Sequence, residues 1–260
     1  MSYSKLFLLL ISSVVIFSEN SIANSKTPPN ALNTPIYLLK HTKCKYRPKD
    51  KTSYCVDKNN KKITGEIRKY ADGKITLSIP VKDGLLEGTT RAFKRNGEKI
   101  YEKSYKNGKL NGLYDTFYDE NKIETSTTYK NGLKEGIAKY YYTNGYIEKQ
   151  LTYVENHMDG KMRTYDKSGK TVFDFITAND KIVKGVYYYL DKKDKVLTAD
   201  LPQIIIDGLN EKCVILKNVL TANCYLIDMA SDEDSDCNTK WLENNQKALE
   251  LQVNKCKPKQ

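Results

Sequence analysis

Histidine is nearly absent from this chain. The 260-residue sequence contains only two, His41 and His157. His41 has no evident partner residues, and His157 follows the turn residue Asn156, where we expect an exposed side chain. Neither supports a nucleophile–base pair or a catalytic metal site. A glycine-rich phosphate loop is also lacking, because the repeat described below accounts for the glycines. We therefore expect a protein that is not an enzyme and uses no cofactor. A secreted enzyme would need a catalytic site near the C-terminus.

Arginine is scarce although the chain is basic. Its 43 basic residues include only five arginines, and the formal net charge is +11. Proteins that read nucleic acids rely on the bidentate arginine fork, so we expect no nucleic-acid partner. An excess of lysine is typical of solvated strand surfaces that resist edge-to-edge pairing. The alternative is weak attraction to anionic envelope polymers or lipid headgroups.

The N-terminal segment, from Met1 to Ala23, has the pattern of a secretory signal peptide. Lys5 precedes an apolar run over residues 6–17, and Ser21-Ile22-Ala23 provides small residues for cleavage. The apolar run is shorter than the roughly 20 residues that span a bilayer, although an uncleaved anchor is the alternative. We expect cleavage after Ala23 and a periplasmic or secreted protein.

A turn signal recurs along the middle of the chain. The spacings between successive signals alternate between 11 and 13 residues, giving a unit of about 24. Most signals are Asp-Gly or Asn-Gly pairs, which favour tight hairpin turns, and Asn is the next-best residue for positive φ. The pattern therefore predicts consecutive β-hairpins. The signals are Gly73, Gly84, Gly97, Gly108, Asn121, Gly132, Gly145, Asn156 and Gly169.

Tyrosine dominates the repeats, whereas leucine and isoleucine are few. This composition predicts a mainly β fold, an elongated single-layer antiparallel β-meander with aromatic ladders across neighbouring strands. A second glycine follows each alternate turn by four residues, as at Gly112 and Gly136. We expect it to let an aromatic side chain of the next strand lie over bare backbone.

These motifs resemble a known repeat. Tyr105-Lys106-Asn107-Gly108-Lys109-Leu110-Asn111-Gly112 and Tyr129-Lys130-Asn131-Gly132-Leu133-Lys134-Glu135-Gly136 are similar to the MORN-variant repeats of bacterial proteins commonly labelled YwqK-like antitoxins. The resemblance covers about residues 57 to 193. It implies a MORN-like hairpin array that acts as a binding or scaffolding module, with an antitoxin or immunity-like role.

Composition divides the chain into four parts. After the signal peptide at residues 1–23 we expect a flexible lead-in at 24–42, the repeat meander at 43–195, and a disulfide-stapled cap at 196–260. Within the cap, residues 201–209 suggest a closing strand and 238–254 a helix. The acidic cluster Asp232, Glu233, Asp234 and Asp236 lacks the glycine and distant glutamate of a calcium loop, and it suits the start of that helix.

Six cysteines in an exported chain predict three disulfides. Cys44 and Cys55 are symmetric about a predicted turn, so they should face each other across a hairpin. Cys237 and Cys256 flank the predicted helix and are too far apart to pair. If residues 209–220 are also helical, the nested pairs Cys213–Cys256 and Cys224–Cys237 are preferred. Residues 213–216 could equally form a strand.

A cluster of tyrosines, in which adjacent residues place aromatic rings on both faces of their strands, is the candidate binding surface. Tyrosine rows among lysines suit recognition of a protein partner in the envelope or outside the cell. The alternatives are that these tyrosines form the core of one sheet face, and that the protein instead attaches to anionic polymers or lipids. The candidate residues are Tyr114, Tyr118, Tyr140, Tyr141, Tyr142, Tyr146, Tyr187, Tyr188 and Tyr189.

Overall fold

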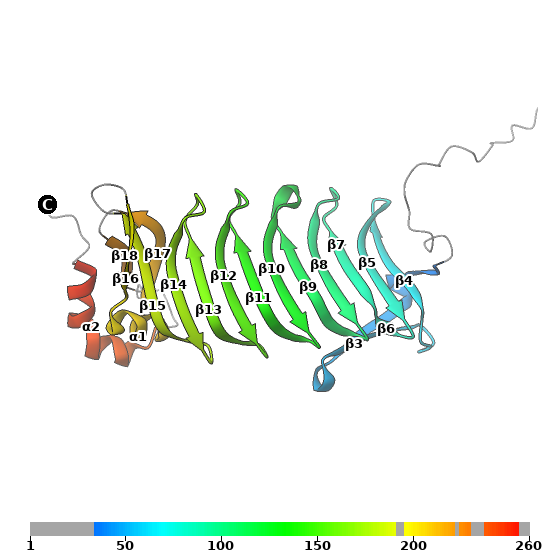
Figure 1. Ribbon diagram of the computed structural model, residues 1–260. Helices are drawn as coiled ribbons and strands as arrows, with labels where there is room; N and C mark the ends of the chain where they lie inside the picture. Colours follow the sequence, from blue (N-terminus) through cyan, green and yellow to red (C-terminus); the bar gives the residue numbers. More distant parts are fainter. Residues whose placement is uncertain (1–33, 191–194, 222–223, 230–236, 255–260) are drawn as a thin grey trace, which may run out of the picture. The chain divides into compact units, whose positions relative to one another are not determined.

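The protein is built on one long antiparallel sheet of hairpins (Figure 1). The computed structural model describes residues 34–190, 195–221, 224–229 and 237–254. From Pro35 onward the chain forms one unit. The predicted signal peptide lies outside the described residues. The mainly β, single-layer meander predicted from the turn spacing is confirmed.

Ten strands form the regular part of the sheet, and each pairs with the next along the chain. They are β7 (Gly88–Phe93), β8 (Lys99–Lys106), β9 (Lys109–Phe117), β10 (Ile123–Lys130), β11 (Leu133–Tyr141), β12 (Ile147–Val154), β13 (His157–Tyr165), β14 (Thr171–Ala178), β15 (Lys181–Leu190) and β16 (Val196–Asp200). A short 3₁₀ turn, η3 (Asp119–Asn121), joins β9 to β10.

The sheet continues at its N-terminal end with the hairpin of β4 (Gly65–Ala71) and β5 (Lys74–Lys82), and β5 pairs with β7. The remaining elements here are β1 (Ile36–Leu38), η1 (Leu39–His41), β2 (Thr42–Arg47), η2 (Pro48–Asp50), β3 (Thr52–Asp57) and β6 (Leu85–Leu86). The predicted lead-in at 24–42 ends too late, because β1 pairs in parallel with β4. The backbone hydrogen bonds of a strand outweigh the proline-rich composition that suggested a linker.

The turns have the backbone that the sequence signal requires. Asn107 and Gly108 adopt φ of 50° and 75°, which suits a two-residue hairpin turn. Asn121 and Asn156, which replace glycine in the series, adopt φ of 58° and 78°. The second glycines lie opposite aromatic residues, Gly112 opposite Tyr129 and Gly136 opposite Tyr153. The side chains nearest the position of a missing Cβ are those of Ser104 at Gly112 and Thr128 at Gly136.

The turns along one end of the sheet are hydrogen-bonded to one another. Each turn donates a backbone N–H to a carbonyl just beyond the preceding turn, and this bond recurs once in every repeat unit. The donor and acceptor pairs are Gly108 to Leu86 (2.8 Å), Gly132 to Leu110 (2.7 Å), Asn156 to Lys134 (3.0 Å) and Asp180 to Met158 (3.0 Å). This turn ladder fixes the stacking of successive hairpins.

Strand β3 runs across this end of the sheet. Its N–H groups at Ser53 and Cys55 donate to the carbonyls of Gly108 and Gly84, at 2.6 and 2.8 Å. The predicted disulfide joins Cys55 to Cys44, which lies directly opposite it in β2. The N-terminal hairpin is thereby tied to the turn ladder.

Two helices and a hairpin form the C-terminal cap: α1 (Gln203–Asn210), β17 (Val214–Thr221), β18 (Cys224–Met229) and α2 (Thr239–Asn254). Helix α2 was predicted correctly. The closing strand predicted at 201–209 is wrong, because β16 closes the sheet and α1 follows it. Pro202 stands just before α1, where a missing N–H costs nothing, and Ile205 and Ile206 point into the core.

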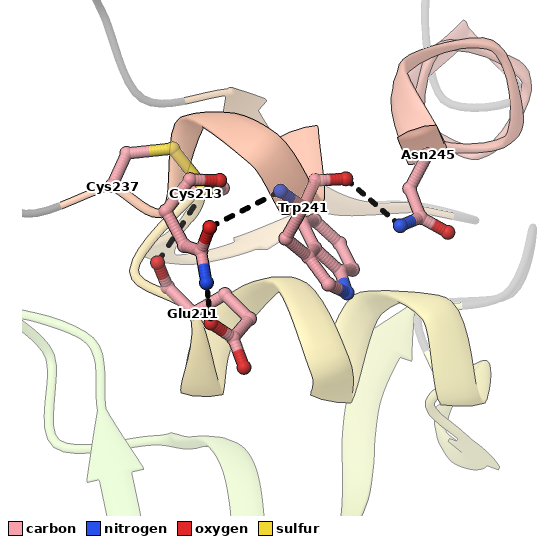
Figure 2. Close-up of a disulfide and its surroundings, with 6 residues drawn as sticks. Glu211, Cys213, Cys237, Trp241 and Asn245 are labelled. Atoms are coloured by element: carbon pink, nitrogen blue, oxygen red, sulfur yellow. Dashed lines mark hydrogen bonds between the residues drawn. A yellow bond between two sulfur atoms is a disulfide. The ribbon is translucent and has the colours of Figure 1, made fainter. Parts of the chain in front are cut away.

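The predicted disulfides Cys213–Cys256 and Cys224–Cys237 are both wrong. Cys213 pairs with Cys237 (Figure 2). The nested pairs assumed two antiparallel helices, but residues 214–221 form a strand. Cys213 therefore lies between α1 and β17, next to the start of α2. Cys256 lies outside the described residues.

Asn238 fixes the start of α2 beside this disulfide. Its side-chain oxygen accepts the Trp241 N–H at 3.1 Å, and its amide donates to the Glu211 carboxylate at 2.8 Å (Figure 2). The first turn of the helix is thereby capped and held against the end of α1. Within the described ranges, no helix combines the length and apolarity needed to cross a membrane.

Asn210 at the end of α1 closes the turn ladder. Its side chain accepts the Ile182 N–H at 2.7 Å and donates to the Ile182 carbonyl at 2.8 Å. Asp180 makes the equivalent bonds to Met158, using its own N–H and its carboxylate. One side-chain amide thus replaces the turn that the next repeat would have supplied.

We expect Asn210→Ala to lower the free energy of unfolding by about 1–3 kcal/mol, because both polar backbone groups of Ile182 lose their partner in a partly buried position. Urea unfolding and amide exchange at Ile182 would measure the effect. Gln203→Ala is the control, since the exposed Gln203 side chain donates to Asp207 on the same helix and takes no part in the turn ladder. Equal stability losses in the two variants would contradict the ladder-closing role.

Candidate binding face

The strand register divides the sheet into two faces. On the face that we call inner, directly paired residues form a row across the strands from Tyr101 to Phe173. Its members are Tyr101, Thr116, Thr125, Tyr140, Lys149, Thr164 and Phe173. On the outer face a parallel row consists of Arg91, Glu102, Asp115, Ser126, Lys139, Gln150, Arg163 and Asp174.

Both ends of the inner face are covered. At the C-terminal end Phe173 and Phe175 pack with Ile205 of α1 and Leu249 of α2 in one buried cluster. At the other end a second cluster joins Ile67, Ile79, Val81 and Leu86 to Cys55 and Ile63, with Tyr37 and Leu39 against it. Among the described residues, neither cluster includes a member of β9 to β12. The inner face between the clusters therefore presents its own side chains.

Tyrosine rings and lysine side chains make up this uncovered part. The Tyr114 ring lies between those of Tyr101 and Tyr129, at centroid distances of 6.4 and 6.1 Å. Lys103 Nζ lies 4.3 Å from the Tyr101 centroid and 4.5 Å from that of Tyr114. We call this surface the tyrosine–lysine face and define it as Tyr101, Lys103, Tyr114, Tyr129, Lys134, Tyr140, Lys149 and Tyr153.

Two further lysine–tyrosine contacts extend the surface. Lys149 Nζ lies 4.6 Å from the Tyr140 centroid, and Lys134 Nζ lies 4.7 Å from that of Tyr153. These are cation–π distances. Ala138 and Leu151 pair with each other on the same face, and Ala138 is fully buried while Leu151 is only 3% exposed. The centre of this single-layer sheet is thereby shielded from solvent on its inner face.

Burial raises the pKa of three tyrosines of the face, Tyr101, Tyr129 and Tyr140, and neighbouring tyrosines add to the effect. At the N-terminal margin of the face, burial raises the pKa of Tyr105 to about 12. The rings therefore present neutral hydroxyl groups, which can donate hydrogen bonds, at any physiological pH.

The two faces differ in how their charges are balanced. In the described residues no carboxylate lies within 4.0 Å of Lys103, Lys134 or Lys149. On the outer face, by contrast, Arg91 pairs with Glu102 at 3.1 Å and Arg163 Nη2 bonds to Asp174 at 2.7 Å. Two of the three basic residues in the outer row are thus paired with a carboxylate, whereas none of the three inner lysines is.

The structure divides the nine candidate tyrosines among several environments. Tyr114 and Tyr140 belong to the tyrosine–lysine face. Tyr187 and Tyr189 share that side of the sheet but lie at its C-terminal end, where Tyr187 packs against the cap cluster and the two rings are 5.5 Å apart. Tyr146 is 53% exposed beside a turn.

The other four candidates lie elsewhere. Tyr118 and Tyr142 donate their hydroxyls to the carbonyls of Tyr141 and Tyr165, at 2.8 Å each, one repeat further on. Tyr188 donates to Asp174 on the outer face at 2.9 Å, and Tyr141 lies on that face near Asp115. The nine residues do not form one surface.

Sequence reasoning missed Tyr101, Tyr129 and Tyr153 as members of the face. Tyr129 and Tyr153 have a usable signal, because they recur one repeat unit apart and each lies opposite a repeat glycine. The lysines carry no such period, and only the strand register brings them to the rings. No group of three or more His, Cys, Asp or Glu side chains could hold a metal ion in the part of the chain that the structure describes.

Comparison with known proteins supports the repeat architecture. A family described as MORN repeat variant matches residues 134–155. The matched stretch covers most of the hairpin of β11 and β12. It contains Lys134, Tyr140, Lys149 and Tyr153 of the tyrosine–lysine face. No curated protein matches the chain.

Among solved structures, the chain is similar to a mutant of S. aureus TarM crystallised with fondaparinux, alpha-GlcNAc-glycerol and UDP. The sequences are 16% identical and the TM-score is 0.28, over 36% of this chain. The match spans only 19% of the TarM chain.

The Asp174 carboxylate gives the outer face a testable pH dependence. Burial is the largest single influence and raises its pKa, but hydrogen bonds from Arg163 and Tyr188 together outweigh burial and lower the pKa. A lowered folded-state pKa stabilises the fold above the ordinary aspartate value of about 3.9, and this contribution is lost as pH falls through the folded value.

We therefore expect Asp174→Asn to lower stability at pH 7 and to flatten the loss of stability below about pH 4. Urea unfolding at a series of pH values between 2 and 7 would measure both effects. Adding Arg163→Gln to Asp174→Asn should remove little more of the acid dependence. If Asp174→Asn loses stability below about pH 4 as steeply as the wild type does, this carboxylate does not contribute to the acid dependence of stability.

Proposed function

We propose that this protein is a non-enzymatic, exported repeat scaffold that binds a protein partner through its tyrosine–lysine face. The observation that carries the proposal is the row of half-buried rings, held by one another and by lysine stems, in the uncovered middle of a face whose two ends are covered. Aromatic residues are enriched in interfaces and supply many of their binding hot spots.

The rings are also arranged before any partner arrives. Tyr114 is held between Tyr101 and Tyr129, and Lys103 lies against two of these rings. Side chains fixed in the free protein lose less conformational entropy when they bind, so more of the contact energy becomes affinity. A surface of this kind is better suited to recognition than to catalysis.

Export is supported by two features. Disulfides Cys44–Cys55 and Cys213–Cys237 favour an oxidising compartment. The signal-peptide pattern ending at Ala23 agrees with it. We infer a periplasmic or secreted location, where the partner belongs to the envelope or the extracellular space. The resemblance to YwqK-like proteins suggests an immunity-like role for the scaffold.

Attachment to anionic envelope polymers or lipid headgroups is the second candidate. It is favoured by the net charge of +11 and by the uncompensated lysines of the inner face. Such attachment should disappear at high ionic strength, because exposed charges are screened, whereas an aromatic interface should persist.

A photo-crosslinking amino acid at position 140 tests the proposal, with position 137 as its matched control. Both positions lie in β11, but Tyr140 faces inward and Ile137 is an exposed outer residue. We expect the oxidised protein to capture one dominant protein from an envelope extract at position 140, in low and in about 1 M salt. Capture at 137 alone, or only salt-labile retention of lipid or polymer, would contradict it.

A further inference from the structure

Resting on that proposed function, we propose that the tyrosine–lysine face takes an acidic, extended segment of the partner protein, whose carboxylates meet Lys103, Lys134 and Lys149. These lysines come from β8, β11 and β12, and each lies against a tyrosine ring. The partner segment therefore crosses the strands of the inner face.

The inner face carries charge of one sign only in its paired rows. The first row includes a single charged residue, Lys149. A second row, which runs through Tyr114 and Ala138, includes Lys103, and a third, shorter row through Tyr129 includes Lys134. Two glutamates, Glu124 and Glu148, lie at bulges near Tyr118, and Glu124 already accepts a hydrogen bond from Thr116 at 3.0 Å. No acidic side chain stands in the rows themselves among the described residues.

The outer face shows that the fold readily pairs such charges. Its central row contains three basic and three acidic residues, Arg91, Lys139, Arg163 and Glu102, Asp115, Asp174. Cross-strand neighbours of opposite charge stabilise a sheet, and a glutamate or aspartate opposite Lys103 or Lys149 would do the same. The inner lysines instead face tyrosine and threonine.

When an ammonium group lies on a tyrosine ring, the hydrogens that point away from the ring remain available for hydrogen bonds. Lysine carries three donors, and a cation–π contact engages one side of the charge. A carboxylate that approaches from solvent would meet a half-buried ammonium in a fixed position. The neighbouring tyrosine hydroxyls can donate to the same oxygens. Partial burial strengthens the attraction over that of a fully exposed pair.

Strand spacing sets a lower limit on the length of the segment. Strands β8 and β12 are four positions apart in the sheet, which corresponds to about 19 Å at roughly 4.8 Å per step. An extended peptide needs at least about six residues to cover this distance, and more because the three lysines also lie in different rows along the strands.

The covered ends favour a peptide over a membrane surface. Helices α1 and α2 pack on the inner face at its C-terminal end, so they rise above the sheet there, and the second buried cluster, which includes Cys55 of β3, closes its N-terminal end. A flat bilayer would meet these segments first. A single extended chain can lie between them.

Selection from a random 12-residue peptide display library on the oxidised full chain tests the inference. We expect the selected peptides to contain two or more acidic residues and to bind the inner variant K103Q/K134Q/K149Q at least tenfold more weakly, by fluorescence anisotropy. The matched outer variant carries the same number of changes and should bind within twofold of the wild type: K109Q/K139Q/K161Q. Urea unfolding of both variants checks that they remain folded.

The outcomes separate the two proposals. Neutral peptides that nevertheless crosslink at position 140 would overturn the acidic segment and leave the proposed function in place. Equal weakening by the inner and outer variants, or no selected peptide, would also overturn the acidic segment. Absence of any protein crosslink at position 140 would overturn both. Phosphatidylglycerol vesicles that displace a bound acidic peptide would overturn the acidic segment in favour of headgroup attachment.

Discussion

The hydrogen bond from each turn to the preceding hairpin is the interaction on which the rest of this structure depends. It recurs once per repeat unit from Gly108 to Asp180, and it locks the register of successive strands. Because side chains alternate between the faces, a slip of one residue would move every tyrosine of the inner face to the outer face. The assignment of Tyr114 and Lys103 to one surface follows directly from this register.

A ladder of this kind must be ended at both sides, and the chain uses different means at each. Asn210 supplies a side-chain copy of the missing turn, while β3 donates from Ser53 and Cys55 to the first turns. Both endings also bring apolar residues onto the inner face, where they form the two buried clusters. The uncovered tyrosine–lysine face is therefore a consequence of how the repeat array is capped.

The sequence predicts whatever depends on local spacing. The pair Asn107-Gly108 favours a tight turn. The spacing of the turn signals also predicts that Cys44 lies opposite Cys55. Helix α1 of the cap escaped prediction because Ile205 and Ile206 suit a strand or a helix equally, until Pro202 before the helix and packing against Phe173 decide between them. The sequence also indicates that adjacent tyrosines such as Tyr140 and Tyr141 lie on opposite faces, and they do. It does not indicate that Tyr101 and Tyr114 meet, because these two come together only through pairing between strands.

Stability alone does not account for the lysines of the inner face. Cross-strand pairs such as Arg163 with Asp174 show that the fold can neutralise a charge within one strand spacing. A carboxylate opposite Lys149 would give the same benefit, and the rows hold tyrosine and threonine there instead. Three lysines on half-buried rings therefore lack a carboxylate partner in the free protein. A partner can supply these carboxylates. Because the lysines lie between two covered ends of the face, an extended chain fits there.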